Sequence, residues 1–308
     1  MTRFDHVSSL AEVRERRPTV LAIGVFDGLH RGHQQLLQQM LAAAQAIEAR
    51  VAVLTFFPHP AEIIRGAAER YYLTTPEERT RLLAAQGIEL LITHPFDQTI
   101  RQTRAADFMQ QLCAALDLRQ LWGGHFSIGY QREGTFEYLS DLGARLGFSV
   151  QRVTDLLRLD GERVSSSRIR RGLQAGEMAD VTACLGRLFS LSGEVVAGRR
   201  LGQTLGFPTA NLRVWERQIL PAHGVYATYA WVGDQRYTAA TNVGVRPTVD
   251  GHHLTVEAHL LDFSGDLYAQ PLRLEFVQHL RPELKFAGLD ALKAQISADI
   301  FAIRALHL

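Results

Sequence analysis

The fold is decided at residues 19–33, which read TVLAIGVFDGLHRGH. The opening TVLAI is an apolar run as long as a buried strand, and the glycine-rich turn after it leads into a segment with helical periodicity. Ligands of open parallel sheets bind beyond the carboxyl ends of the strands, where such a turn lies. The stretch therefore predicts a strand, a turn that holds a ligand, and a helix.

The same alternation of apolar runs and helical stretches continues to about residue 155. It predicts a Rossmann-like domain, in which helices cover both faces of a parallel sheet. The predicted strands are 19–24, 51–56, 88–94, 118–124 and 148–153, and the predicted helices are 34–49, 76–86, 104–116 and 137–146.

The pattern changes after about residue 185. Short runs rich in β-branched and aromatic residues, separated by Gly, Pro and Asp turns, predict an antiparallel barrel or sandwich that ends in one helix over 289–306. The stretch 171–187 is interpreted as a helical connector. We therefore expect two domains, residues 1–184 and 185–308.

Composition excludes several classes of protein. The net charge of +1 gives no support to nucleic-acid or membrane binding, and neither a signal peptide nor an apolar span is found, so a cytoplasmic protein is expected. The only lysines are Lys285 and Lys293, which rules out a lysine-bearing P-loop in residues 1–284. The only asparagines are Asn211 and Asn242, both in turn-like segments of the second part.

The glycines of the first turn suit phosphate binding. Gly24, Gly28 and Gly32 allow close approach of the backbone to a phosphate, and the helix start supplies unpaired N–H donors. His30 and His33 can point the same way and donate to phosphate oxygens. A metal pair and a plain turn with two surface histidines are the weaker alternatives.

These residues resemble the Gly-x-Phe-Asp-Gly-x-His-x-Gly-His motif of the nucleotidyltransferase superfamily. More narrowly, they resemble the FAD synthetase module of prokaryotic bifunctional riboflavin kinase/FAD synthetases, as do TFFPHP at 55–60 and SSSRIR at 165–170. The resemblance implies attack of the FMN phosphate on the α-phosphate of ATP. It implies catalytic roles for His30, His33 and Arg170. The implied ATP contacts are Gly24, Phe26, Asp27, Gly28, His30, Gly32, His33, Ser165, Ser166, Ser167 and Arg170. The implied flavin contacts are Pro58, His59, Pro60, Phe126 and Gly129.

One segment departs from that family. GGHFSIG at 123–129 stands where the family usually reads Gly-x-Asp-Phe-Arg-Phe-Gly, so His125, Ser127 and Ile128 replace Asp, Arg and Phe. This leaves an alternative open, in which the kinase is active and the FMN adenylyltransferase is impaired or inactive.

A second glycine-rich stretch, GQTLGFPTAN at 202–211, opens the second part. Gly202 and Gly206 can form a concave set of amides around phosphate, and the oxygens of Thr209 and Asn211 suit Mg²⁺. On its own the stretch could be a plain loop between strands. The segments that follow it, 224–227, 242–248, 256–268 and 281–286, resemble riboflavin kinases in sequence and order.

That second resemblance implies an all-β riboflavin kinase domain with a C-terminal helix. Glu257 matches the family's general base, although a carboxylate on the polar face of a strand is more often only solvated. Gly202, Gly206, Phe207, Pro208, Thr209 and Asn211 match the ATP and phosphate site, with Thr209 and Asn211 as Mg²⁺ ligands. Arg281, Asn242 and Arg246 are equally open to flavin or nucleotide contacts and to structural roles.

The leading hypothesis is therefore an enzyme that converts riboflavin to FMN and FMN to FAD, using ATP and Mg²⁺ at both steps. A flavin-sensing regulator is a weaker alternative, because no DNA-binding helix pair or basic patch is visible. The expected partners are riboflavin, FMN, FAD and ATP, with no nucleic acid and no membrane, in a monomer or weak homo-oligomer.

Overall fold

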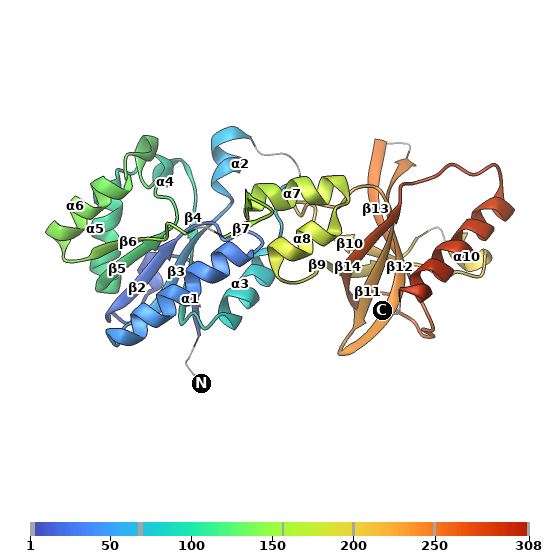
Figure 1. Ribbon diagram of the computed structural model, residues 1–308, viewed down its shortest axis with the longest axis horizontal. Coiled ribbons are helices and arrows are strands. Elements are labelled where there is room, and N and C mark those ends of the chain that lie inside the picture. Colours follow the sequence, from blue (N-terminus) through green and yellow to red (C-terminus); the bar gives the residue numbers. More distant parts are fainter. Residues whose placement is uncertain (1–3, 67–69, 156, 199–200, 249–250, 307–308) are drawn as a thin grey trace. The chain divides into compact units, whose positions relative to one another are not determined.

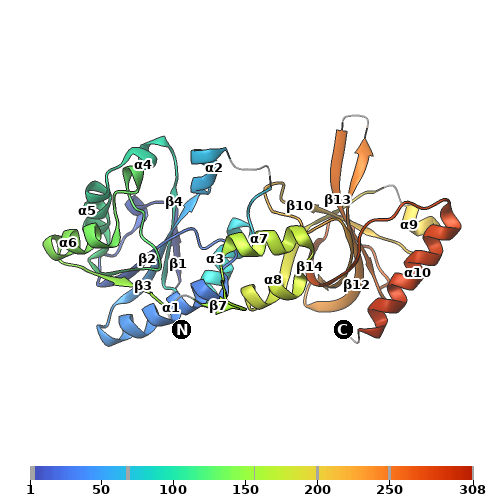
Figure 2. The same ribbon diagram turned by 45° about the horizontal axis from the view of Figure 1, so that its top comes forward.

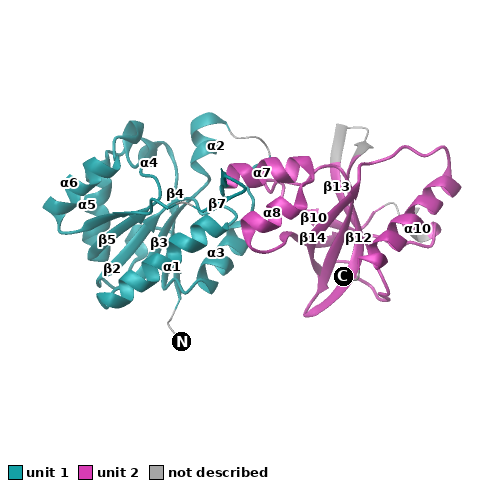
Figure 3. Cartoon of the chain, in the orientation of Figure 1, with its two compact units in different colours: residues 1–165 teal, residues 166–308 magenta. Residues whose placement is uncertain are grey.

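The computed structural model describes residues 4–66, 70–155, 157–198, 201–248 and 251–306, with the backbone alone at 201, 203, 246–248 and 251–253. The chain divides into two compact units, residues 1–165 and 166–308 (Figure 3). The predicted boundary at 184/185 lies nineteen residues later. The difference is the helix pair α7 (Ser166–Ala175) and α8 (Met178–Leu185), because α8 packs on strands of the second unit.

The first unit contains a parallel sheet with the strand order β1-β4-β3-β2-β5-β6. The chain moves outward from β2 through β3 and β4, then crosses back to place β5 on the other side of β2. Strand β2 is thus the point where the order reverses, which is where open sheets form a ligand crevice. The strands are β1 (Asp5–Val7), β2 (Thr19–Ile23), β3 (Arg50–Phe57), β4 (Leu90–Pro95), β5 (Leu118–Gly123) and β6 (Ser149–Arg152).

Helices cover both faces of this sheet, as predicted (Figures 1 and 2). Val20 and Ala22 of β2 pack in one apolar core with α1 (Arg31–Ala46) and α3 (Pro76–Ala85). Leu21 packs in the other, with α5 (Ala105–Leu116) and α6 (Phe136–Leu146). The elements that the sequence analysis missed are short: β1, α2 (Pro60–Arg65), α4 (Gln98–Gln102) and the hairpin β7 (Arg158–Leu159) and β8 (Glu162–Arg163).

The second unit contains a closed antiparallel barrel in the order β10-β13-β12-β11-β14-β9, so the barrel alternative is confirmed. Alternate residues fill it, among them Tyr226, Val256 and Phe276, each at most 2% exposed. Helix α10 (Leu289–Ala305) lies along the outside, where Ile303 packs on Ala227 (Figure 2). The strands are β9 (Phe189–Val196), β10 (Ala210–Val214), β11 (Gly224–Val232), β12 (Gln235–Thr248), β13 (Gly251–Leu260) and β14 (Pro271–Arg281), with the short α9 (Leu201–Thr204) before β10. Strand β10 was not predicted.

Candidate active sites

The turn after β2 is held rigidly by buried contacts. Phe26 and Gly28 have positive φ angles of 52° and 79°, and Phe26 is 2% exposed. The buried Asp27 carboxylate accepts hydrogen bonds from the backbone N–H of Leu73 (3.0 Å) and of Thr74 (3.2 Å). Asp27 thus ties the turn to the segment before α3, which is a structural contribution to the predicted ATP site.

The two histidines lie together at the start of α1. His30 is the N-cap, and its Nδ1 accepts a hydrogen bond from the His33 N–H at 3.3 Å, which leaves the proton of the neutral ring on Nε2. The rings of His30 and His33 stack with centroids 3.6 Å apart. A side chain at position 32 would stand 3.2 Å from His30 Nδ1, so Gly32 allows this packing.

Burial determines the protonation state of His33. Burial, followed by the nearby His30 and Arg163, holds the pKa of His33 well below its usual value, and its Nδ1 is buried with no hydrogen-bond partner among the described residues. A ring with such a pKa is neutral near pH 7. His33 therefore offers a neutral hydrogen-bonding ring, and its predicted contact with the ATP phosphates stays a prediction.

The serine-rich segment crosses the division between the units. Ser165 ends the first unit, whereas Ser166, Ser167 and Arg170 belong to α7 in the second. Arg170 is 9% exposed. Their predicted ATP contacts remain predictions.

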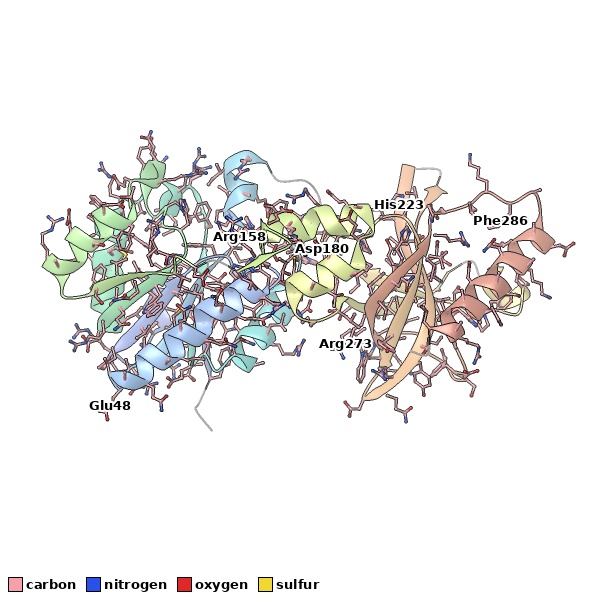
Figure 4. All side chains as sticks on the ribbon, viewed as in Figure 1. Glu48, Arg158, Asp180, His223, Arg273 and Phe286 are labelled. Carbon is pink, nitrogen blue, oxygen red and sulfur yellow. The ribbon has the colours of Figure 1, made fainter. Side chains whose placement is uncertain are left out.

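Arg168, which the sequence analysis passed over, joins α7 to α8. Its Nε donates to Asp180 at 3.1 Å in a nearly buried ion pair (Asp180 is labelled in Figure 4). Spacing alone could not have identified this pair, because the two residues lie on different helices.

A cavity of about 570 Å³ lies at the end of the sheet in the first unit. It is lined by the ends of β2 and β3, the start of α2, helix α4 and the segment 125–132. Of the predicted flavin contacts, His59, Pro60, Phe126 and Gly129 line the cavity, and Pro58 does not. His59 is the N-cap of α2 and accepts from the Ala61 N–H at 3.0 Å. Gly129 is required by its φ of 79° and by Ala105 N, which would stand 2.4 Å from a Cβ there.

The charge of this lining is one-sided. Arg65, Arg101 and Arg132 contribute to it, together with His59 and His125, and the lining contains no Asp or Glu. Within the described parts of the chain, none of the three guanidinium groups pairs with a carboxylate, and the nearby Glu133 is bound by Arg104. The cavity therefore suits an anionic ligand, although Ser127 stands where the family usually has Arg.

A second cavity, of about 410 Å³, lies on the outer surface of the barrel in the second unit. Asn211, Glu257 and Asn242 are direct neighbours on β10, β13 and β12, and side chains of such neighbours point to the same face. All three line the cavity, and the same row continues through Val225 on β11 to Arg281 on β14. The register thus brings the predicted base and one predicted Mg²⁺ ligand side by side.

The loop before β10 completes the polar part of this cavity. Gly202, Phe207 and Thr209 line it, whereas Gly206 and Pro208 do not. Gly206 adopts a positive φ of 89°, and the Pro208 carbonyl oxygen lies 2.8 Å from Nδ1 of His259. These two positions shape the loop, and the side chain of Arg246, also considered from the sequence, lies outside what is described.

The opposite wall comes from α10 and the segment before it. It is largely apolar, with Leu284, Phe286, Leu292 and Ile296 (Phe286 is labelled in Figure 4), and Val225 of β11 and Ala240 of β12 adjoin it from the barrel. The Arg281 guanidinium donates to Asp299 of α10 at 2.9 Å and 2.7 Å. Arg281 therefore fastens α10 to the barrel, a structural role that the sequence analysis left open.

The donors at Thr209 and Asn211 fit Mg²⁺. Both are hard oxygen ligands, they share a cavity with Glu257, and Thr209 Oγ1 lies close to the backbone at Gly202. Elsewhere, no group of three His, Cys, Asp or Glu side chains that could hold a metal occurs among the described residues. In the same residues no helix is long and apolar enough to cross a membrane.

Comparisons with known proteins cover both units. The FAD synthetase family profile matches residues 12–168, and the riboflavin kinase profile matches residues 185–307. The bifunctional riboflavin kinase/FMN adenylyltransferase of Pseudomonas fluorescens is 37% identical over 297 residues, 95% of this chain and 94% of that protein. The protein of the same name from Escherichia coli K12 is 37% identical over 288 residues, 92% and 91% of the two chains. A solved structure described as a macrolide-efflux protein from Streptococcus pneumoniae is similar with a TM-score of 0.88, 26% identity and 98% coverage of both chains.

Proposed function

This chain belongs to the family of bifunctional riboflavin kinase/FMN adenylyltransferases, and we propose that its two reactions take place at the two cavities described above. The chain phosphorylates riboflavin to FMN and transfers an adenylyl group from ATP to FMN, which gives FAD. The proposal rests above all on Glu257, which faces a cavity between Asn211 and an apolar wall.

In the kinase cavity, the two ends suit two substrates. The ATP phosphates bind at the end lined by Gly202, Thr209 and Asn211. The isoalloxazine ring binds against the apolar wall of α10. In this proposal the terminal ribityl hydroxyl lies near Glu257, which accepts its proton as the oxygen attacks the γ-phosphate of ATP. The bond from the γ-phosphorus to the bridging oxygen breaks, and ADP leaves. Thr209 and Asn211 would hold Mg²⁺, which would neutralise phosphate charge there.

In the adenylyltransferase cavity, no general base is needed. The FMN phosphate is already an anion and attacks the α-phosphate of ATP, with pyrophosphate as the leaving group. His30 and His33 donate hydrogen bonds to the ATP phosphates at the turn. The positive charge that the resemblance assigns to Arg170 stays a prediction. Catalysis is then positioning plus charge stabilisation.

Nothing observed favours the alternative in which the adenylyltransferase is impaired. The departures at 125, 127 and 128 leave a cavity that keeps Phe126 and Gly129 and carries three arginines. The positive charge lost at Ser127 is available from Arg101 and Arg132 in the same lining. We further propose a cytoplasmic enzyme, and the expectation of a monomer or weak homo-oligomer stays a prediction.

Separate substitutions test the assignment of one site to each reaction. Glu257→Gln removes the base but keeps the size of the side chain, so FMN formation should fall at least about 100-fold, with FAD formation from added FMN unchanged. His33→Ala should do the reverse. Both are measured by chromatographic separation of flavins after incubation with MgATP. Loss of both reactions in either folded variant would contradict the separate sites.

A further inference from the structure

Asn242 lies on the opposite side of Glu257 from the predicted Mg²⁺ ligand. It is the direct neighbour of Glu257 on β12, as Asn211 is on β10. These are the only asparagines among 308 residues, and both line the kinase cavity. The chain thus uses this residue type only at the two positions beside the proposed base.

The Asn242 amide is available to a ligand. It is half-buried, and it forms no hydrogen bond with any residue that the structure describes. Its neighbours in the strand, Thr241 and Val243, point into the barrel and are fully buried. The amide therefore contributes nothing visible to the core and stays open to a ligand in the cavity.

Its place in the row indicates which ligand group it meets. On one side lies Glu257, where the reacting hydroxyl must sit, and on the other side lies Val225 at the edge of the apolar wall. A flavin whose ring rests on that wall and whose terminal hydroxyl reaches Glu257 must pass its ribityl chain over Asn242. An amide both donates and accepts, as a chain of secondary hydroxyls requires.

We infer that the Asn242 amide forms hydrogen bonds with the secondary hydroxyls of the ribityl chain. It thereby determines the preference of the kinase for a flavin that carries a polyol chain. The inference rests on the proposed kinase site. It assigns Asn242 a role in specificity, distinct from the Mg²⁺ role of Asn211 and the base role of Glu257.

The experiment compares riboflavin with its 10-(5-hydroxypentyl) analogue, which keeps the ring and the reacting hydroxyl but lacks the secondary hydroxyls. For the unaltered enzyme, kcat/KM should favour riboflavin by about tenfold, the size of one well-placed hydrogen bond to a neutral group. Asn242→Ala should lower kcat/KM for riboflavin by about that factor, leave the analogue unaffected, and so abolish the preference.

Two controls use the same protein. Asn211→Ala should lower kcat/KM for both flavins equally and keep the preference, because its partner is on the ATP side. Phosphorylation of the analogue by the Asn242 variant at the unaltered rate reports that the barrel is folded. An unchanged preference in Asn242→Ala, or an equal loss with both flavins, would overturn the inference. A different result would contradict the proposed kinase site itself: FMN formation retained in the Glu257→Gln variant.

Discussion

Two ion pairs join helix α10 to the rest of the barrel unit, and they differ in burial. We predict that the buried pair contributes far more to the free energy of unfolding than the exposed pair does. The Arg281–Asp299 pair is enclosed, with side chains 18% and 8% exposed, and Gln295 adds a hydrogen bond to Asp299 at 2.9 Å. Asp299→Asn keeps the shape but leaves Arg281 without a counter-charge. Removal of one partner of a buried pair costs 3–5 kcal/mol. Since Arg281 keeps a bond to the Pro282 carbonyl and some exposure, we expect a loss of about 2–3 kcal/mol in the free energy of unfolding of the barrel.

The second pair supplies the matched control. Arg304 and Asp262 are 2.7 Å apart, but their side chains are 54% and 72% exposed. An ion pair in water gains little from its contact, because solvent screens the charges and both side chains lose freedom. Arg304→Ala should therefore leave the unfolding midpoint unchanged.

The assay is urea unfolding followed by tryptophan fluorescence in a Trp122→Phe background. The remaining Trp215 and Trp231 both belong to the barrel unit, so the signal reports the unit that contains α10. Equal effects of the two substitutions would refute the argument from burial, as would a loss below about 1 kcal/mol for Asp299→Asn.

Two further predictions concern the two sites. A Cβ at position 198 would clash with the Asn211 amide nitrogen, so Gly198→Ala should turn the Asn211 side chain away. The Mg²⁺ concentration needed for half-maximal FMN formation should then rise severalfold. Gly288→Ala is the control, because a Cβ there would meet nothing within 4 Å and should leave this concentration unchanged. The pKa of His33 in the folded protein lies below its value near 6.5 in the unfolded chain. As the pH falls, the unfolded chain therefore binds a proton at His33 before the folded protein does. The stability that neutral His33 contributes is thus present above pH 6.5 and is lost below it. The advantage of the unaltered protein over His33→Gln in unfolding midpoint should therefore shrink between pH 7.5 and 5.5, and a constant gap would contradict the assigned neutral ring.

Much of the architecture follows from local sequence patterns. Apolar runs and helical periodicity predicted the sheet strands from β2 to β6 and four helices, because burial of one face imposes a period of about 3.6 on a helix. The alternation of Thr255, Glu257 and His259 with buried neighbours correctly placed Glu257 on the outer face of β13. The short elements β1, α2, α4 and β10 were missed because few apolar residues mark them.

The sequence by itself therefore determined the two kinds of domain, the glycine-rich turn before α1 and the face that Glu257 occupies. Only the tertiary structure decided that Asn211 and Asn242 flank Glu257, that Arg281 is bound to Asp299, and that Arg101 shares a cavity with Ser127. The reason is that local periodicity depends on neighbours in the chain, whereas strand register and helix docking join residues far apart in it. A shift of one residue in the pairing of β12 with β13 would keep the same sequence pattern but separate the two side chains.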